Sequence, residues 1–264
     1  MILKFYKPKT PSQRSLIKCF LENLNKTPLL KSKLKGVKNS SGRNNQGKIT
    51  SYHKGGGHKK RYRTISFNKI FLVKGIVTSI EYDPNRTSYI ISIFDLKEKQ
   101  YFYALAPLNI KIGNIIQYGL NAKIKLGNKL PVIEIPLGCF IHNISYGNTL
   151  NYSRSAGTFS ILLKKTLDFG IIRLSSGELK KIPLDSYANI GLVSNSGHFL
   201  ETTGKAGRSR WLNKRPTVRG VAMNPIDHPH GGGEGKTSGG RPSVTPWGKP
   251  TRNILTKRSK KKNG

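Results

Sequence analysis

The stretch Leu72-Val-Lys-Gly-Ile-Val-Thr-Ser-Ile-Glu-Tyr82, continued by Asp83-Pro-Asn-Arg86 and Thr87-Ser-Tyr-Ile-Ile-Ser-Ile-Phe94, decides the fold class. Its first and last parts have the texture of short strands, and apolar residues alternate with serine along part of the last. Asp-Pro-Asn between them is typical of a turn. We therefore predict two neighbouring strands, 72–82 and 87–94.

Further strands are predicted downstream at 99–105, 115–118 and 122–126. Short strands with turns about every 8–12 residues, and no convincing helix between them, indicate a small antiparallel barrel. Five strands fit an OB-like barrel, which we place at residues 66–130.

A second barrel of SH3-like size is predicted at residues 131–203. Leu130-Pro-Val-Ile-Glu-Ile-Pro-Leu-Gly138 is interpreted as a proline-punctuated linker that leads into it. Its strands are predicted at 139–145, 160–169, 170–174, 178–182 and 188–193. His142 and His198 fall among these strands, and we expect both to be structural rather than ligands.

Positive charge is concentrated at the two ends of the chain. The 264 residues include 47 basic and 12 acidic side chains, a formal net charge of +35. Residues 1–65 hold 17 basic and 1 acidic residue, and residues 201–264 hold 15 and 3. This charge implies a polyanionic partner, either nucleic acid or an anionic membrane surface. The predicted fold is thus mainly β, with long basic irregular extensions at 1–65 and 204–264.

Other features exclude several classes of protein. The sequence has no run of about 18 apolar residues, so no transmembrane helix is expected. Cys19 and Cys139 are far apart and give neither a disulfide framework nor zinc-type spacing, which favours a reducing compartment. Residues 1–41 show no clear signal peptide, and Glu22 with the early prolines argues against a transit peptide.

Residues 215–241 have no apolar period and contain prolines and a run of three glycines. Such a segment cannot bury enough apolar surface to fold alone, so a partner must order it. Its basic residues outnumber its acidic ones, and glycine lets backbone N–H groups approach a phosphate closely. We predict a loop that is moulded onto nucleic acid.

Residues 42–63 form a second basic, glycine-rich loop. Its Lys and Arg side chains can neutralise phosphates, while Tyr52, Tyr62 and His58 can stack on unpaired bases. The alternative is a solvated charge run. His53 and His58 have no further zinc-like ligand nearby, so we predict no metal site.

Two sequence patterns that could indicate an enzyme do not meet the requirements of their motifs. Gly231-Gly-Gly-Glu-Gly-Lys-Thr237 resembles a phosphate-binding loop, but His230 stands where that motif needs its first glycine, and no strand or helix pattern flanks it. Asp227, His228, His230 and Glu234 lie in one Pro/Gly loop that lacks a rigid scaffold for catalysis. We predict no catalytic residue, and no ATP binding.

Trp211 is surrounded by Arg208, Arg210, Lys214 and Arg215. It could plug the second barrel or serve as a platform for base stacking, and we favour the plug. Arg154-Ser-Ala-Gly157 is a small-residue loop with one basic side chain, suited to a close backbone contact with RNA.

Several motifs together resemble the L-two family of universal large-subunit ribosomal proteins. They occur in family order from about residue 42 to 250: Gly42-Arg-Asn-Asn-Gln-Gly47, Gly55-Gly-Gly-His-Lys59, Glu81-Tyr-Asp-Pro-Asn-Arg86, Arg154-Ser-Ala-Gly-Thr158, Gly204-Lys-Ala-Gly-Arg208, Arg215-Pro-Thr-Val-Arg-Gly220, Met223-Asn-Pro225, Asp227-His-Pro-His-Gly-Gly-Gly-Glu-Gly235 and Val244-Thr-Pro-Trp-Gly248. As a set these motifs are very specific, whereas any one alone is weak.

The resemblance implies an OB-like domain, an SH3-like barrel and long arms that thread through large-subunit rRNA. It implies a structural role in assembly, in subunit association and in supporting the peptidyl-transferase region, for which His228 and His230 are the candidates. The partners it implies are the rRNA, neighbouring large-subunit proteins and small-subunit contacts at the intersubunit bridge, with no membrane. No cofactor is expected, and Mg²⁺ enters only through the rRNA.

The residues predicted to bind RNA are mostly basic and lie in the loops and extensions: Arg43, Lys48, His53, Lys54, His58, Lys59, Lys60, Arg61, Arg63, Arg86, Arg154, Lys205, Arg208, Arg210, Lys214, Arg215, Arg219, Asn224, His228, His230, Lys236, Arg241 and Trp247. Phosphate neutralisation by the arms would supply affinity. A stand-alone nucleic-acid chaperone built on the same barrels is the alternative function.

The mitochondrial ribosome is the expected location, with a plastid or the bacterial cytoplasm as alternatives. Lys236-Thr-Ser-Gly-Gly-Arg241 before Val244 resembles the alpha-proteobacterial and mitochondrial form, and the Lys-, Asn- and Ile-rich texture suggests an AT-rich genome. Two segments depart from the family pattern. Residues 1–41 match it poorly, and Asn148-Thr-Leu-Asn-Tyr-Ser153 replaces its usual Lys-Gly-Gly.

Overall fold

The computed structural model describes residues 2–21, 23–147, 150–235, 237 and 239–252. The chain divides into two compact units. Unit 1 comprises residues 1–40 and 56–212, and unit 2 comprises residues 41–55 and 213–264. Unit 1 therefore contains both predicted barrels, while unit 2 joins a short piece of the predicted N-terminal extension to most of the C-terminal one. The four-segment division made from the sequence stays a prediction.

The first barrel of unit 1 is built around β6, the longest strand. The bounds of its strands are β6 Leu72–Glu81, β7 Ile90–Asp95, β8 Gln100–Leu105 and β9 Ile115–Tyr118. β6 pairs antiparallel with both β7 and β9, and β7 pairs with β8. Val77, Ile93 and Ile116 are fully buried in its core. The predicted strand at 122–126 is wrong, because these residues form turns and bends without strand pairing.

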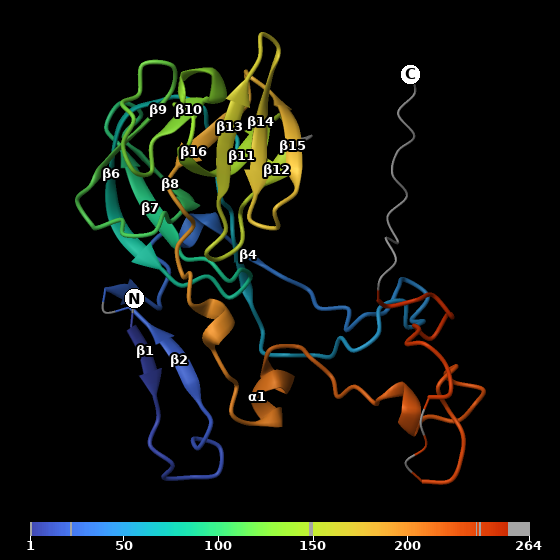
Figure 1. Cartoon of the computed structure of the whole chain (residues 1–264). Helices are drawn as coiled ribbons and strands as arrows, with labels where there is room; N and C mark the ends of the chain where they lie inside the picture. Colours follow the sequence, from blue (N-terminus) through green and yellow to red (C-terminus); the bar gives the residue numbers. More distant parts are fainter. Residues whose placement is uncertain (1, 22, 148–149, 236, 238, 253–264) are drawn as a thin grey trace. The chain divides into compact units, whose positions relative to one another are not determined.

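The second barrel has its own apolar core, which includes Ile141, Leu162 and Ile172. Its strands are β11 Phe140–Tyr146, β12 Leu150–Tyr152, β13 Ser160–Lys165, β14 Phe169–Leu174, β15 Leu179–Pro183 and β16 Tyr187–Ile190. One sheet runs through both barrels in the order β15-β14-β13-β11-β16-β10-β9-β6-β7-β8, as can be followed in Figure 1. The predicted fold class, an OB-like barrel followed by an SH3-like barrel, is confirmed.

The segment interpreted as a linker is part of the core. β10 Lys129–Pro131 pairs antiparallel with β16 and parallel with β9, and so joins the two barrels. The short 3-10 helix η2 Val132–Glu134 follows it. Leu130 and Ile135 are buried against the second barrel. Pro131 ends the strand instead of breaking the core, because the next amide, that of Val132, donates to the Ser186 carbonyl oxygen at 2.8 Å.

The N-terminal part of unit 1 forms short elements, of which residues 24–30 lie against the first barrel. Its elements are β1 Ile2–Phe5, β2 Ile17–Phe20, β3 Leu24–Asn25, η1 Lys31–Lys33, β4 Leu34–Gly36 and β5 Arg61–Arg63. β1 pairs with β2, β3 with β6, and β4 with β5. The buried Glu81 carboxylate accepts bonds from the Leu29 amide at 3.2 Å and the Tyr103 hydroxyl at 2.8 Å. These bonds hold residues 24–30 against the barrel.

Short helices lead out of the second barrel. η3 spans His198–Leu200 and α1 spans Ala206–Trp211 in unit 1, and η4 spans Gly220–Ala222 in unit 2. His142 is structural, as expected: it is fully buried in β11 and Nδ1 donates to the Gly191 carbonyl oxygen at 2.9 Å. Burial lowers the pKa of His142 to about 4. His198 lies in η3 rather than in a strand, 3.1 Å from the Glu201 carboxylate.

Candidate nucleic-acid interface

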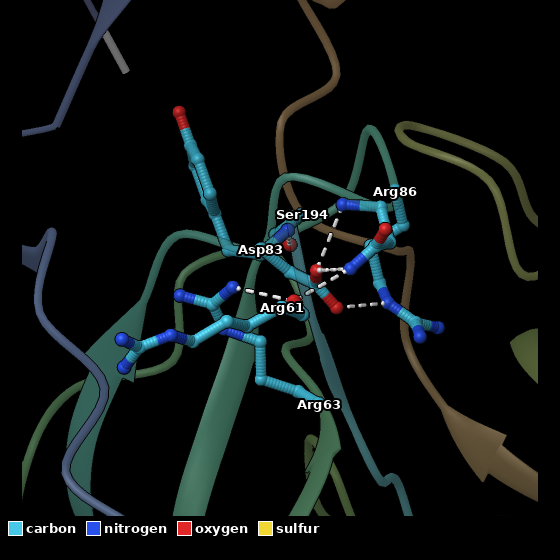
Figure 2. Close-up of polar contacts among 7 residues, drawn as sticks. Arg61, Arg63, Asp83, Arg86 and Ser194 are labelled. Atoms are coloured by element: carbon cyan, nitrogen blue, oxygen red, sulfur yellow. Dashed lines mark hydrogen bonds and ion pairs between the residues drawn. The ribbon is translucent and has the colours of Figure 1, made fainter. Parts of the chain in front are cut away.

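The turn after β6 positions an arginine side chain at the surface of unit 1. Asp83 is fully buried, and its carboxylate accepts a bond from Arg86 Nε at 2.6 Å (Figure 2). It also accepts a bond from the backbone amide of Asn85 at 2.9 Å. Asn85 also donates to the Arg61 carbonyl oxygen at 2.8 Å, which ties this turn to β5. The Asp-Pro-Asn-Arg sequence thus reverses the chain and also orients a side chain, because Asp83 holds the guanidinium of Arg86.

Arg86 and Arg154 both lie over the ring of Phe67. Their guanidinium carbons are 5.8 and 4.0 Å from the ring centroid, within the range of cation–π attraction. Arg154 Nε donates to Asn143 Oδ1 at 2.9 Å, but its Nη2 is buried with no hydrogen-bond partner among the described residues. Burial, and then the charge of Arg86, lower the pKa of Arg154. The structure therefore holds two cations close together with a donor still unsatisfied.

A third cation lies near this pair. Lys129 is buried, and its ammonium group donates to the carbonyl oxygens of Phe67 at 2.7 Å and Lys69 at 3.2 Å. Burial, and then the charge of Arg154, lower the pKa of Lys129 to about 8. The positive potential around Phe67 is suited to an anion such as a phosphate group.

Trp211 does not plug the second barrel, contrary to the prediction. It ends α1 with 56% of its surface exposed, and the Lys205 ammonium lies over its ring at 4.7 Å. Together with His58, Lys59, Lys60, Arg61 and Arg63 it lines one groove of unit 1. Arg63 is the least exposed of these, at 6%, and its Nη1 donates to the Arg61 carbonyl oxygen at 3.0 Å. Arg208 and Arg210 lie on α1.

In unit 2 the two glycine-rich segments are paired with each other. Lys54 forms an isolated bridge with Lys214, and the Arg215 amide donates to the His53 carbonyl oxygen at 2.9 Å. The His53 ring adds a bond from Nδ1 to the Pro216 carbonyl oxygen at 3.2 Å. The rings of Tyr52 and Trp247 lie 6.4 Å apart. Loops that are about 160 residues apart in sequence thus form one basic surface.

His228 and His230 shape the Asp-His-Pro-His loop. The amide of His230 donates to His228 Nδ1 at 3.0 Å, and the amide of Val244 donates to His230 Nε2 at 3.0 Å. An amide can only donate, so His228 Nδ1 and His230 Nε2 are both acceptors. A β-carbon on Gly220 would lie 2.5 Å from the His228 ring. The histidines therefore act as acceptors that fold the loop.

Most of the other predicted RNA contacts are exposed in unit 2: Arg43, Lys48, Lys54, Lys214, Arg215, Arg219, Asn224, Arg241 and Trp247. Lys236 and the basic residues from 257 onward lie outside the described residues. No group of three or more His, Cys, Asp or Glu side chains in the described ranges is arranged to hold a metal ion. No helix in the described part of the chain combines the length and apolar character needed to cross a bilayer.

Sequence reasoning missed four residues that contribute to these sites: Lys26, Phe67, Tyr82 and the buried Asn143. Phe67 lies 19 residues before Arg86 and 87 before Arg154, so no local pattern links them. The sequence did offer a signal for Tyr82, because this aromatic residue stands between the polar residues Glu81 and Asp83 at the start of the turn motif.

Comparison with known families gives two matches. The model described as "Ribosomal Proteins L2, RNA binding N-terminal domain" matches residues 30–118, and that described as "Ribosomal Proteins L2, C-terminal domain" matches residues 125–248. Together they contain Phe67, both arginines that lie over it, and the histidine loop.

Curated relatives extend the match over nearly the whole chain. "Large ribosomal subunit protein uL2" of Rickettsia massiliae is 50% identical over 265 aligned residues, covering 99% of this chain and 96% of the relative. "Large ribosomal subunit protein uL2m" of Reclinomonas americana is 49% identical over 267, covering 100% and 96%. Residues 1–29 fall outside the family models but within these alignments. The chain therefore belongs to the L2 family of large-subunit ribosomal proteins.

Proposed function

We propose that this protein, a structural constituent of the large ribosomal subunit, holds the rRNA in two different ways. Unit 1 presents two cations that converge over Phe67, Arg86 and Arg154, and these would bind an anion. Unit 2 presents an extended basic surface without an apolar core in its described residues. The first would fix the protein at one phosphate, and the second would follow the folded RNA over a longer path.

The observation that carries this proposal is the unsatisfied Nη2 of Arg154. A buried donor without a partner costs about 1–3 kcal/mol, so its retention favours a ligand that completes the bond. A phosphate oxygen would complete this bond once the half-buried guanidinium turns outward, since arginine binds phosphate in a planar, charge-assisted geometry. Arg86 is already oriented by Asp83 and lies near enough to influence the charge of Arg154.

The histidine loop supports a role near the peptidyl-transferase region through its shape rather than through chemistry. Both histidines accept amide hydrogens within the loop, so neither is placed as a free acid or base. His228 is the more buried, with 8% of its surface exposed, and is the better candidate for holding the loop's conformation. The exposed residues around it, including Asn224 and Arg219, would then contact the rRNA. Any Mg²⁺ at this surface would belong to the rRNA.

We place the protein in a mitochondrial ribosome, with further contacts to neighbouring large-subunit proteins and to the small subunit at an intersubunit bridge. The similarity to a mitochondrial relative and the AT-rich texture of the sequence support this compartment. Similarity to Rickettsia proteins is of the same degree, so a bacterial cytoplasm is the alternative. Gradient sedimentation of an organelle fraction in magnesium buffer, with detection of this chain, separates the two.

The anion site is tested by Arg154→Gln. Binding of the full chain to large-subunit rRNA, measured from 50 to 300 mM salt, should weaken about 10- to 150-fold because a charge-assisted bond is lost. The slope of log K against log salt should fall by about one. Arg173→Gln, an exposed arginine of β14, is the matched control and should change the affinity less than about twofold. Equal effects of the two substitutions would show that only net charge matters.

A further inference from the structure

A groove in unit 1 has aromatic walls and a basic rim. It has a volume of about 670 Å³ and is lined by Lys26, His58, Lys60, Arg61, Tyr82 and Trp211, among others. Tyr82 and Trp211 are 45% and 56% exposed, so both rings offer accessible surface. The volume lies within the range of about 300–1,000 Å³ that is usual for ligand sites.

Hydrogen bonds hold the walls of this groove together. The Tyr82 amide donates to the Asn25 carbonyl oxygen at 2.9 Å, which fixes Tyr82 beside Lys26. On the other side, the His58 amide donates to the Trp211 carbonyl oxygen at 3.1 Å and joins the basic segment to the end of α1. The groove is thus built from four separate segments of unit 1, which these backbone bonds join in two pairs. The bond from the Asn85 side chain to the Arg61 carbonyl oxygen links the two pairs, so the groove needs little reorganisation to bind.

The chemistry of the lining selects the occupant. Five basic side chains line the groove, namely Lys26, Lys59, Lys60, Arg61 and Arg63, and no acidic residue is among its described lining. An aromatic face next to such a rim matches a nucleotide, whose base stacks while its phosphate pairs with a cation. The His58 ring donates from Nδ1 to the Lys59 carbonyl oxygen at 3.0 Å, so Nε2 of the neutral ring is an acceptor for a base N–H.

We propose that this groove captures one unpaired nucleotide of the large-subunit rRNA, with its base stacked on Trp211 or Tyr82 and its phosphate against Lys60 or Arg61. The inference rests on the proposed rRNA binding and adds a stacking site that is separate from the anion site at Phe67. The Lys205 ammonium lies over one face of the Trp211 ring by a cation–π contact, so the base would stack on the opposite face. A peptide segment from a neighbouring protein would need acidic residues to match the rim.

The test compares two substitutions at one position in the full chain. Trp211→Leu keeps an apolar side chain but removes the stacking face, and Trp211→Phe keeps a face. We expect Trp211→Leu to weaken binding to the large-subunit rRNA about 5- to 150-fold, with an unchanged salt slope since no charge is lost. Trp211→Phe should stay within about threefold of the wild type. Phe199→Leu, at an 81% exposed aromatic of the same unit outside the groove, should have no effect.

A second measurement uses the unsubstituted protein, so it does not depend on the folding of a variant. Ultraviolet crosslinking of the assembled subunit, followed by mass spectrometry, should give nucleotide adducts at Trp211 or Tyr82. Wild-type affinity of Trp211→Leu, equal losses in the Leu and Phe variants, or a peptide adduct in the groove would overturn the inference while rRNA binding itself stands. Failure of the wild-type chain to bind the rRNA would overturn both proposals.

Discussion

Unit 1 is stabilised by a buried apolar core, whereas unit 2 has no such core in its described residues. Every buried apolar side chain of the described residues belongs to unit 1, whereas the buried side chain of unit 2 in these ranges is that of His228. Unit 2 carries 15 basic and 2 acidic residues in 67, and unit 1 carries 32 and 10 in 197. Ordering a residue costs about 1–2 kcal/mol of backbone entropy, which apolar burial offsets in unit 1. In unit 2 this entropy cost must be offset by contacts with a partner. The positive charge of unit 2 indicates that the partner is RNA.

The largest expected effect is on the core of unit 1. Ile116→Ala removes a fully buried side chain of β9 and should lower the free energy of unfolding by about 2–5 kcal/mol through lost transfer energy and a residual cavity. Val221→Ala in η4 of unit 2 removes a half-exposed side chain and should change it by less than about 0.5 kcal/mol. Urea unfolding followed by circular dichroism measures both. A loss of more than 2 kcal/mol for Val221→Ala would show that unit 2 contributes to the cooperative fold.

The second effect is an acid sensitivity of unit 1 that comes from the buried His142. The pKa of His142 is about 4 in the folded protein, against about 6.5 when unfolded, so between these values only the unfolded chain binds the proton. Stability is therefore intact above pH 6.5 and falls by up to about 3 kcal/mol as the pH drops toward 4.

His142→Asn keeps an N–H for the Gly191 carbonyl but does not titrate, so it should lose this part of the pH dependence. Urea midpoints of the variant and the wild type at pH 7.0, 5.5 and 4.5 give the comparison. His198→Asn serves as the control, because that histidine is only half-buried in η3 and lies outside the core. Parallel pH profiles of the wild type and His142→Asn would contradict the account.

The smallest expected effect concerns the part that unit 2, as compared with unit 1, plays in RNA binding. Arg43→Ala with Lys48→Ala removes two exposed cations from unit 2 and should lower the salt slope of rRNA binding by about two. The free energy of unfolding should stay within about 0.5 kcal/mol, since neither side chain packs against a core. Filter binding over a salt series, with urea unfolding beside it, checks both. An unchanged slope would place the phosphate contacts of this loop elsewhere.

The elements of unit 1 can be predicted from the sequence better than those of unit 2. The apolar burial that stabilises unit 1 also leaves a periodic pattern in its sequence. Strands of unit 1 follow the alternation of apolar residues, so β9 was predicted with its observed bounds and β6 to within one residue. Pro131 concealed β10, because a proline at the end of a strand looks like a break. α1 was missed because its short basic sequence has no apolar stripe.

The candidate site was predictable as chemistry but not as geometry. The basic loops and the histidine motif are visible in the sequence. In the structure most of the basic residues are exposed or line the groove, whereas His228 is buried. The stacking of Arg86 and Arg154 on Phe67 depends on how β5, the turn at Asp83 and the loop after β12 meet in three dimensions. The acceptor roles of His228 and His230 depend on amides two and fourteen residues further along the chain.

Amide hydrogen exchange tests the difference between the two units most directly. It should be measured by mass spectrometry on the free full-length chain and on the same chain in the assembled large subunit. We predict that β6, β7 and β16 of unit 1 are protected in both states, while residues 215–235 of unit 2 exchange rapidly in the free chain and become protected only in the subunit. Strong protection of residues 215–235 in the free chain would contradict the account, because it would mean that unit 2 is ordered without RNA.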